Sequence, residues 1–370
     1  MSNRHEVAVV GTGGIANVHA ADLARLADRA AIAAAVDPDP DRLDAFCRRW
    51  SVPRRHTTLE AMLDAEQPDL VDLCTPPGLH AAQAVACLDR GHTVLCEKPP
   101  ALSLAELDQI AVAERAGGGR FAGVFQHRFG SGAWTLRGLV RDGRLGGAMT
   151  AVCHTLWFRP DEYFTVPWRG RWEVEGGGPT LGHGIHQMDL LLFILGQWQS
   201  VVAVADRRAR PTETEDLSAA VVTFACGAVA TVVNSLLSPR ETSYLRFDFA
   251  HATVELEHLY GYSDDNWMVS AAPGMEAAVD EAWRSGPKGI PSGHGAQFAA
   301  VFDAIEAGAP PPVGQDAIRP TLDLVTAVYA AAFTGRPVEA GEIGPDSPFY
   351  RQLHGGPGAG LVPWLEMMAG

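Results

Sequence analysis

Val7-Ala8-Val9-Val10-Gly11-Thr12-Gly13-Gly14-Ile15-Ala16 is the stretch that decides the fold of this 370-residue sequence. The apolar run predicts a strand, and the glycine-rich turn after it opens a helical pattern. The first glycine permits a tight turn, the second lets the backbone approach a pyrophosphate, and Ala16 allows the helix to pack closely on the strand. The helix start supplies unpaired N–H groups and a positive dipole end for phosphates. Residues 11–16 are therefore predicted to bind a dinucleotide.

The first part of the chain continues this pattern, because short β-branched runs alternate with alanine-rich helical stretches. Such alternation is typical of a parallel sheet wrapped by helices. The predicted strands are Glu6–Val10, Ala31–Val36, Leu70–Cys74, His92–Cys96 and Arg120–Phe125. The predicted helices are Ile15–Leu26, Pro40–Trp50, Leu59–Ala65, Ala81–Arg90 and Ser103–Ala116. Ser103 and Glu106 have the spacing of a capping box. We expect a doubly wound α/β Rossmann domain over residues 1–126.

The pattern changes near Phe129, where strands begin to follow one another directly. The predicted strands are Ala148–Trp157, Ser200–Ala205, Ala219–Phe224, Ala228–Ser235, Tyr244–Phe249 and Thr253–Leu259, with a hairpin turn at 225–227. One helix is predicted from Thr180, as a possible N-cap, to Leu195, and later helices cover His294–Ala307 and Thr321–Phe333. We expect an α+β domain with a largely antiparallel sheet over residues 127–336 and a surface tail over 337–370.

Composition limits the partners of the protein. Hydrophobic residues make up 47% and charged residues 20%, and the formal charge is −15, which disfavours nucleic acid and anionic membranes. Residues 1–5 lead into a strand pattern without a signal sequence, and the longest apolar run, Leu190–Leu195, is too short to span a membrane. The six cysteines form no Cys-x-x-Cys pair, and most lie in apolar runs. Buried free thiols predict a cytoplasmic protein.

Asp37 follows the second predicted strand and points to the cofactor. A carboxylate at this position accepts hydrogen bonds from the adenosine ribose hydroxyls and repels a 2′-phosphate. We therefore expect NAD rather than NADP, although the nearby Arg42 softens the preference.

Two further motifs follow predicted strands, Thr75-Pro76-Pro77-Gly78-Leu79-His80 and Glu97-Lys98-Pro99-Pro100. Doubly wound sheets bind ligands at the carboxyl ends of their strands, where both motifs lie. Proline after Lys98 restricts the backbone and fixes the direction of the lysine.

With these motifs the sequence resembles the glucose–fructose oxidoreductase/inositol dehydrogenase (Gfo/Idh/MocA) family over nearly its whole length. The matching segments include residues 11–16, His19, Asp37, 75–77, His80, 97–99, 126–129, 168–169, 176–178, 184–190, 304–308, 327–329 and 335–337. The resemblance implies a Rossmann domain, an open-faced sheet domain, and NAD(P)-dependent oxidation of sugars, cyclitols or their derivatives. It also implies that the open sheet face packs against another subunit, so we expect a homodimer or homotetramer.

The resemblance assigns roles to individual residues. The lysine of Glu-Lys-Pro, here Lys98, contacts the substrate hydroxyl, and His186 beside it acts as acid/base. Both residue types suit proton transfer near neutral pH. The expected cofactor-binding residues are Gly11, Thr12, Gly13, Gly14, Ile15, Ala16, Asp37, Thr75, Pro76, His80, Glu97, Lys98 and Gln126.

The sequence departs from the family pattern at Gly182, where Asp or Asn is usual four residues before the histidine. On one helix, residues i and i+4 share a face, so this carboxylate would point toward the same substrate as His186. Three explanations stay open. The first explanation is that His183 takes over the polar contacts as a further catalytic and substrate-binding residue. The second is that a bulkier substrate, such as a glycoside, fills the space. The third is that the ordinary dehydrogenase chemistry is lost. The first two together are favoured.

The remaining candidates lie on the same domain. Trp157, Trp168 and Arg169 are expected to bind substrate together with Gly182 and His183, because aromatic faces cover sugar C–H groups and guanidinium contacts hydroxyls. A packed loop at the domain interface is the alternative. His183, His186 and Asp189 are spaced by three and invite a metal site, but such steps drift around a helix, so we expect no metal.

The sequence thus predicts an NAD(P)-dependent oxidoreductase acting on a secondary hydroxyl of a sugar, cyclitol or glycoside. One alternative uses transient oxidation with bound NAD for net hydrolysis, elimination or epimerisation. The other is a non-catalytic dinucleotide-binding regulatory protein.

Overall fold

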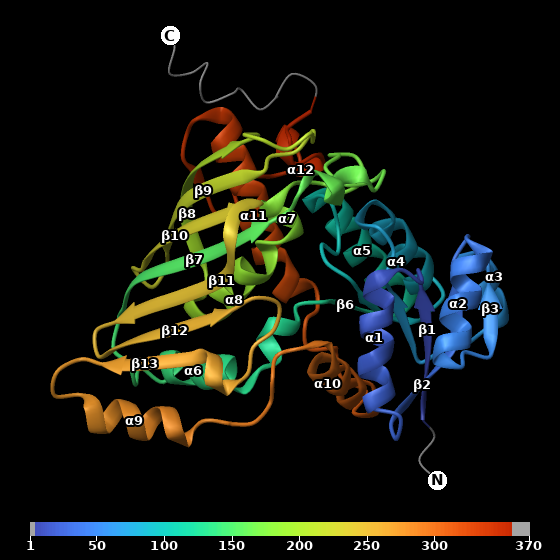
Figure 1. Cartoon of the computed structure of the whole chain (residues 1–370), viewed down its shortest axis with the longest axis horizontal. Helices are drawn as coiled ribbons and strands as arrows, with labels where there is room; N and C mark the ends of the chain where they lie inside the picture. Colours follow the sequence, from blue (N-terminus) through green and yellow to red (C-terminus); the bar gives the residue numbers. More distant parts are fainter. Residues whose placement is uncertain (1–3, 357–370) are drawn as a thin grey trace. The chain divides into compact units, whose positions relative to one another are not determined.

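The computed structural model describes residues 4–356, which form two compact units (Figure 1). The first unit comprises Met1–Val124 and His294–Ile318, and the second comprises Phe125–Gly293 and Arg319–Gly370. The expected boundary at 126/127 lies close to the one observed. The contiguous domain expected over 127–336 is not observed, because the segment 294–318 belongs to the first unit. Residues 357–370 of the expected tail lie outside the described residues.

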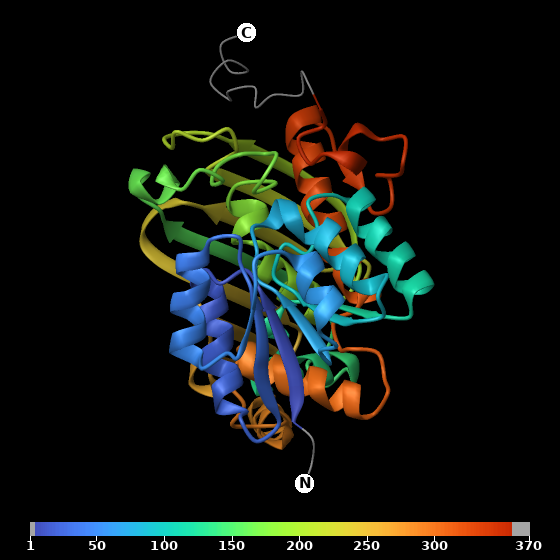
Figure 2. The same ribbon diagram turned by 90° about the vertical axis from the view of Figure 1, so that its right-hand side faces the viewer.

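The first unit contains a six-stranded parallel sheet in the order β3-β2-β1-β4-β5-β6. Helices lie on both sides of its strands (Figure 2), which confirms the doubly wound Rossmann fold. The strands are β1 (His5–Val10), β2 (Ala30–Val36), β3 (Arg54–His56), β4 (Leu70–Leu73), β5 (Thr93–Cys96) and β6 (Arg120–Gly123). The helices are α1 (Gly14–Arg25), α2 (Pro40–Trp50), α3 (Leu59–Ala65), η1 (Pro77–Leu79), α4 (His80–Leu88), α5 (Leu104–Gly117) and α10 (His294–Glu306).

Helix α10 belongs to this unit because its apolar face completes the core. Phe298, Val301 and Phe302 are fully buried among residues of β1 and α1 such as Val7 and Leu23. Burying an aromatic or aliphatic side chain of this size stabilises a fold by about 1.5–3 kcal/mol. The core therefore holds α10 with the parallel sheet although α10 is distant in the sequence.

Local sequence signals set the helix ends. The Ser103 hydroxyl accepts a hydrogen bond from the Glu106 N–H at 3.1 Å, as the predicted cap requires, and α5 ends at Gly118 with φ of +76°. The Glu106 carboxylate accepts from the Leu102 N–H at 2.7 Å rather than from Ser103, so the predicted box is shifted by one residue.

The second unit contains an eight-stranded sheet in the order β13-β12-β11-β7-β10-β9-β8-β14. All neighbours are antiparallel except β7 and β10, which confirms the mostly antiparallel prediction. The strands are β7 (Ala148–Phe158), β8 (Trp198–Asp206), β9 (Leu217–Phe224), β10 (Val229–Ser235), β11 (Leu237–Phe249), β12 (Ala252–His258), β13 (Trp267–Ala271) and β14 (Val338–Glu339). Strand β14, from the expected surface tail, therefore belongs to the sheet.

The helices of the second unit pack mainly on one side of this sheet (Figure 1). They are η2 (Gln126–Phe129), α6 (Ser131–Arg141), η3 (Asp161–Thr165), α7 (Pro179–Gly182), α8 (Ile185–Leu195), η4 (Asp264–Asn266), α9 (Glu276–Ser285), α11 (Gln315–Thr334) and α12 (Pro348–Arg351). Helix α11 begins six residues before the predicted start and contains Pro320, and its first residues belong to the first unit.

The single helix predicted from Thr180 to Leu195 is wrong. Helix α7 begins at Pro179, with Gly178 rather than Thr180 at the N-cap, and ends at Gly182; α8 begins at Ile185. Glycine weakens a helix by about 1 kcal/mol relative to alanine, so Gly182 and Gly184 favour a break here. A Cβ on Gly184 would lie 2.0 Å from the Asn234 side-chain oxygen, so glycine is required at that position. The helix ends at Gly196, as predicted.

Alternate residues of β8, β9 and β10 face opposite sides of the sheet. Val201, Val222 and Ala230 are buried, whereas the intervening Val202, Val221 and Val229 are 41–45% exposed. Val202 and Val221 are also cross-strand neighbours. The sheet thus has a packed face and an apolar face that this chain leaves exposed.

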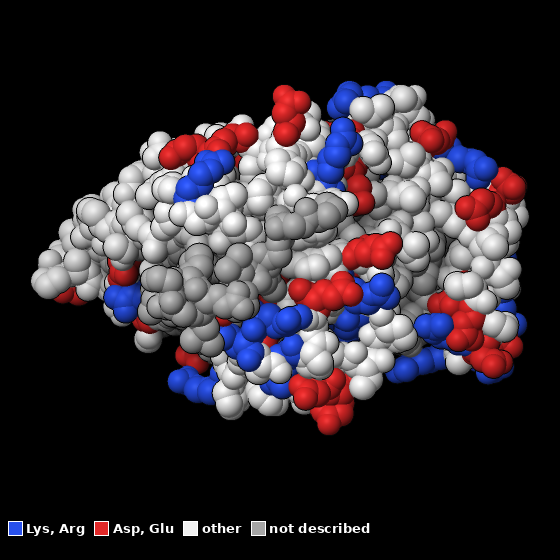
Figure 3. All heavy atoms as spheres, turned by 90° about the horizontal axis from the view of Figure 1, so that it is seen from above, with Lys and Arg blue, Asp and Glu red and all other residues white. Residues whose placement is uncertain are grey.

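Charged side chains of both signs are interspersed on the molecular face drawn in Figure 3. In the part of the chain that the structure describes, no helix combines the length and apolar character needed to cross a membrane. Five cysteines are buried free thiols, and Cys226 in the hairpin turn is exposed.

Candidate functional site

The glycine turn of the first unit has the geometry that its sequence predicts. Gly11 has φ of +85°, and a Cβ there would lie 2.9 Å from the backbone of Cys74, so only glycine fits. A Cβ on Gly13 or Gly14 would meet no atom within 4 Å. Ala16 is fully buried against the sheet.

The start of α1 fits a pyrophosphate. The N-cap Gly13 makes no side-chain capping bond, and the first turn of α1 carries no acidic residue. The first N–H groups of a helix lack intrahelical partners and attract anions. Open space above Gly13 and Gly14 and an uncapped helix start therefore form a cradle that the phosphates of a dinucleotide would occupy.

The Asp37 carboxylate holds this turn in place through hydrogen bonds. Its Oδ2 accepts hydrogen bonds from the Thr12 N–H and the Thr12 hydroxyl, both at 2.9 Å, and its side chain is buried. Its Oδ1 accepts from the Asp39 N–H at 2.9 Å and lies 3.5 Å from Nε of Arg42. Asp37 thus shapes the turn in addition to any contact with a ribose, which stays a prediction.

The ends of β4 and β5 are tied together by His80. Its Nδ1 lies 2.8 Å from the Pro99 carbonyl oxygen and its Nε2 lies 2.8 Å from the Thr75 carbonyl oxygen. Burial lowers the pKa of His80, and the two carbonyl groups partly offset that effect. One buried imidazole ring therefore holds the two segments that leave the strands and carry Thr75 and Lys98. Pro76 follows Thr75 in the first of these segments.

Glu97 is buried and directs its carboxylate into the unit. Its Oε2 accepts from the Lys98 N–H at 2.9 Å, while its Oε1 lies 3.1 Å from Nε2 of His19. Burial raises the pKa of Glu97, but hydrogen bonds from His19 and His294 hold it well below its usual value. Glu97 therefore supports the backbone at Lys98 from inside the fold.

In the second unit, His186 lies in the first turn of α8 among other imidazole rings. The rings of His127 and His186 lie 4.9 Å apart, and those of His127 and His258 lie 5.1 Å apart. The Gln187 amide nitrogen lies 3.3 Å from Nδ1 of His127 and 3.2 Å from Nε2 of His258. Burial, together with the charge of His127, lowers the pKa of His258 to about 3, which keeps it neutral. His186 is thus set in a buried group of polar rings.

His183 lies in the break between α7 and α8 and is surrounded by aromatic rings. The Trp157 ring packs edge-on against it at 5.0 Å, and the Tyr163 ring lies at 6.2 Å. Tyr260 packs against Trp157 at 4.8 Å. We call Trp157, Tyr163, Trp168 and Tyr260 the aromatic group.

Two arginines lie on the aromatic group, and each contacts a carboxylate. Arg159 lies over Trp157 and Tyr163 and pairs with Glu241 at 2.8 Å. Arg169 lies over Trp168 and Tyr163, is hydrogen-bonded to the Tyr163 hydroxyl, and pairs with Glu175 at 3.3 Å. Their positive charges are therefore balanced within the second unit.

Gly182 faces open space, since a Cβ at this position would meet no atom within 4 Å. The segment before it is held by Glu215, whose carboxylate accepts from the Gly178 N–H at 3.0 Å, the Thr180 N–H at 3.1 Å and the Tyr329 hydroxyl at 2.9 Å. Burial raises the pKa of Glu215 to about 7, although these hydrogen bonds oppose the shift. Because α7 and α8 are separate, the expected shared helix face of Gly182 and His186 is not observed.

Asp189 has a structural partner. Arg128 donates from Nε to Oδ2 at 2.7 Å and from Nη2 to Oδ1 at 2.6 Å, and the Thr321 hydroxyl donates to Oδ1 at 2.9 Å. Both carboxylate oxygens are thus engaged in a buried, bidentate ion pair.

The sequence-predicted residues divide between the units. The first unit gathers residues 11–16, Asp37, Thr75, Pro76, His80, Glu97 and Lys98; the second holds Gln126, Trp157, Trp168, Arg169, Gly182, His183 and His186. Gln126 was expected to bind cofactor and begins η2 in the second unit. Sequence reasoning gave no role to His127, His258 or Glu215. His127 lies within a quoted family motif, which was the available signal, whereas Glu215 and His258 carried none.

Models of two domains match the chain. "Oxidoreductase family, NAD-binding Rossmann fold" matches residues 5–124, and "GFO/IDH/MocA C-terminal domain" matches residues 134–272. A D-apiose dehydrogenase of Paraburkholderia graminis is 27% identical over 344 residues, which covers 87% of this chain and 86% of that protein. A D-glucoside 3-dehydrogenase of Escherichia coli is 30% identical over 194 residues, covering 51% of this chain and only 54% of that protein.

Solved structures agree with this match. The WlbA dehydrogenase of Bordetella pertussis, solved with NADH and UDP-GlcNAcA, has a TM-score of 0.82 at 25% identity and covers 91% of this chain and 99% of its own. The homologous sequences include named sugar and inositol dehydrogenases. With both of its domains matched in order, the chain belongs to the Gfo/Idh/MocA family of oxidoreductases, and its first unit is the family's NAD-binding Rossmann fold.

Proposed function

We propose that this protein is an NAD-dependent dehydrogenase that oxidises a secondary hydroxyl of an uncharged sugar, cyclitol or glycoside. One observation carries the proposal: His186 and His183 lie among buried polar rings and sugar-compatible aromatic side chains in a chain whose other unit is an NAD-binding fold. Relatives named as dehydrogenases of glucosides, apiose and inositol support the same reaction class.

The residues divide the chemistry between them. NAD, when bound, supplies the acceptor for the hydride that leaves the carbinol carbon. Lys98 Nζ donates a hydrogen bond to the hydroxyl oxygen, and the His186 imidazole takes the hydroxyl proton as the C–H bond breaks. His183 positions the substrate beside Trp157. The glycine turn, Asp37, Thr75, Pro76, His80, Glu97 and Gln126 bind or support the cofactor.

An uncharged substrate is favoured by the charge balance of the aromatic group. Arg159 and Arg169, with their partners Glu241 and Glu175, bring no net positive charge to it. A phosphate or carboxylate in the substrate would have to compete with these glutamates. An uncharged sugar does not compete with these glutamates, because its C–H groups pack on the aromatic rings instead.

Activity tests of paired variants check the catalytic roles. Lys98→Ala and His186→Ala should each lower kcat by about 10²–10⁴-fold, because each removes a group that moves or stabilises the transferred proton. NADH formation is followed with neutral sugars, cyclitols, glycosides, sugar acids and UDP-sugars, using NAD and NADP in parallel. Lys288→Ala, which changes the only other lysine, and His154→Ala on β7 are the matched controls.

Three outcomes would contradict this proposal. Unchanged turnover in both variants would favour the regulatory protein. Product formation with copurified NAD but no accumulating NADH would favour net non-redox chemistry. A preference for sugar acids or UDP-sugars would contradict the uncharged substrate.

The open space at Gly182 gives a specificity test. Gly182→Asp restores the family's carboxylate and should raise KM for glycosides with a bulky aglycone by about tenfold more than for the free sugar, because it fills space that we assign to the aglycone. Gly138→Asp on α6, another helical glycine whose Cβ would meet no atom within 4 Å, is the control. Equal changes in KM for both substrates would contradict the assignment of this space to the aglycone.

We further propose that the exposed valine face of the sheet forms a dimer or tetramer contact, since a contiguous apolar face is commonly covered by another subunit. Val221→Lys should therefore lower the mass measured by light scattering toward that of the monomer. Val112→Lys on α5, where Val112 is 57% exposed, should leave it unchanged. A monomeric wild-type protein at micromolar concentration would contradict this assembly. The buried free thiols favour the reducing cytoplasm as its location.

A further inference from the structure

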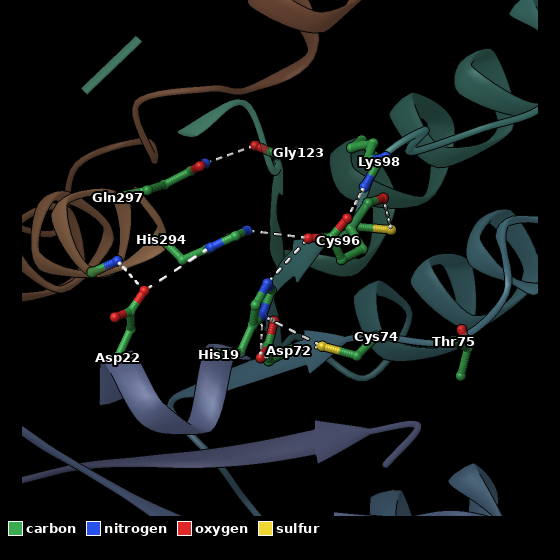
Figure 4. A network of polar contacts seen from close by, with 12 residues as sticks. His19, Asp22, Asp72, Cys74, Thr75, Cys96, Lys98, Gly123, His294 and Gln297 are labelled. Atoms are coloured by element: carbon green, nitrogen blue, oxygen red, sulfur yellow. Dashed lines mark hydrogen bonds and ion pairs between the residues drawn. The ribbon is translucent and has the colours of Figure 1, made fainter. Parts of the chain in front are cut away.

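Four polar side chains from distant segments of the first unit lie close together, and Figure 4 labels three of them, His19, Asp72 and His294. The four are His19 on α1, Asp72 on β4, Glu97 after β5 and His294 at the start of α10. Asp72 and His19 are fully buried, and the Glu97 and His294 side chains are 6% and 13% exposed. Such a concentration of ionisable groups inside a domain requires balanced charges.

The two imidazoles direct nitrogen atoms toward one carboxylate oxygen. Nε2 of His19 lies 3.1 Å from Oε1 of Glu97, and Nε2 of His294 lies 3.5 Å from the same oxygen. These three atoms all lie within 4.8 Å of one another. The other oxygen of Glu97 is held by the Lys98 N–H, which leaves Oε1 turned toward the histidines.

The two separations of 3.1 and 3.5 Å are close to those between the ligand atoms of a zinc ion. Zinc binds imidazole nitrogen and carboxylate oxygen at about 2.0–2.2 Å in tetrahedral geometry, which places neighbouring ligand atoms about 3.3–3.5 Å apart. Small adjustments of the three side chains would bring each atom to bonding distance from one ion. Two histidines and one carboxylate are also the protein ligands of known zinc sites in which water occupies the fourth position.

One surrounding carboxylate supplies the outer contact that a metal-binding histidine needs. A histidine that binds metal through one nitrogen usually donates its other N–H to a carboxylate or carbonyl group. Nδ1 of His19 lies 2.9 Å from Oδ2 of Asp72, which is a hydrogen-bond distance, whereas Nδ1 of His294 lies 4.0 Å from Oδ2 of Asp22, which is too far for a hydrogen bond. A divalent ion would also balance the charges of Asp72 and Glu97 with both imidazoles neutral.

We propose that His19, Glu97 and His294 bind one zinc ion, with water as the fourth ligand. No step of the proposed oxidation uses the ion. The ion would link the start of α10 to the segment after β5 that carries Lys98. It would thereby stabilise the attachment of His294–Ile318 to the first unit. This site differs from the His183, His186 and Asp189 set, and it replaces, for the first unit, the expectation of no metal.

The rival arrangement uses the same atoms without metal. A His19 imidazolium between Asp72 and Glu97 would donate one hydrogen bond to each carboxylate. The two arrangements differ in metal content and in their response to a chelator, which makes them separable without measuring catalysis.

The test uses the full-length protein with bound NAD, after removal of any histidine tag. Metal analysis of protein purified without added ions should give about one zinc per chain. Dialysis against a strong chelator should lower the Tm, and zinc chloride should restore it, because a ligand of the native state stabilises that state. Cobalt chloride added to the chelator-treated protein should produce the visible absorption of tetrahedral Co²⁺.

A matched pair of variants locates the ion. His294→Gln should weaken zinc binding, measured by calorimetry, by at least about 100-fold, because it removes a ligand. His56→Gln should leave it unchanged: that histidine is 14% exposed and pairs with Glu66 at 3.0 Å, but lies outside this cluster.

Wild-type protein with no zinc and no saturable binding would overturn the proposal and favour the imidazolium. Equal losses in both variants would show adventitious binding and would also overturn it. If His294→Gln fails to fold, the zinc content, cobalt spectrum and Tm of the wild-type protein decide the question.

Discussion

The hydrogen bonds between Asp37 and Thr12 are the interaction on which the conformation of the glycine turn in the first unit depends. Gly11 can turn with positive φ because it has no side chain to meet Cys74, but that freedom alone does not select one conformation. Two hydrogen bonds to one buried carboxylate oxygen fix the next residue of the turn. The start of α1 then keeps its N–H groups directed to open space. The shape of this candidate cradle therefore depends on a carboxylate that directly follows β2.

The second unit positions its candidate site by interrupting a helix. Glycines at 182 and 184 end α7 and allow the chain to pass close to Asn234 before α8 begins. His183 lies in the interruption and faces aromatic rings, whereas His186 lies in the first turn of α8 beside His127. Glu215 and Asp189 hold the two helices through buried hydrogen bonds. The break thus lets two nearby histidines face different neighbours.

Much of this architecture could be predicted because its signals are local. The glycine turn, the Ser103 cap and the strand alternation each occupy a few consecutive residues, and each is confirmed. The break after Gly182 was missed because the apolar pattern continues through it, and the close approach of Asn234 is a tertiary contact. The grouping of α10 with the first unit, and the contacts of Glu215 and His258, depend likewise on residues far apart in the sequence. Helices α6 and α9 and the short polar strand β3 also escaped prediction.

The measurement that tests the central claim most directly is the affinity for NADH and NADPH of the wild-type protein and its Asp37→Ala variant. Asp39→Ala removes a neighbouring carboxylate that also pairs with Arg42 and serves as the control. If Asp37 both anchors the turn and selects NAD, its loss should weaken the binding of both cofactors because the turn loses its hydrogen bonds. The affinity for NADH should fall by about 10–100-fold and that for NADPH by less, because removing the carboxylate also removes its repulsion of the 2′-phosphate. The control should bind both cofactors with unchanged affinity. Equal losses of affinity for both cofactors would contradict the selection of NAD by Asp37, and unchanged affinities would contradict its role in the turn.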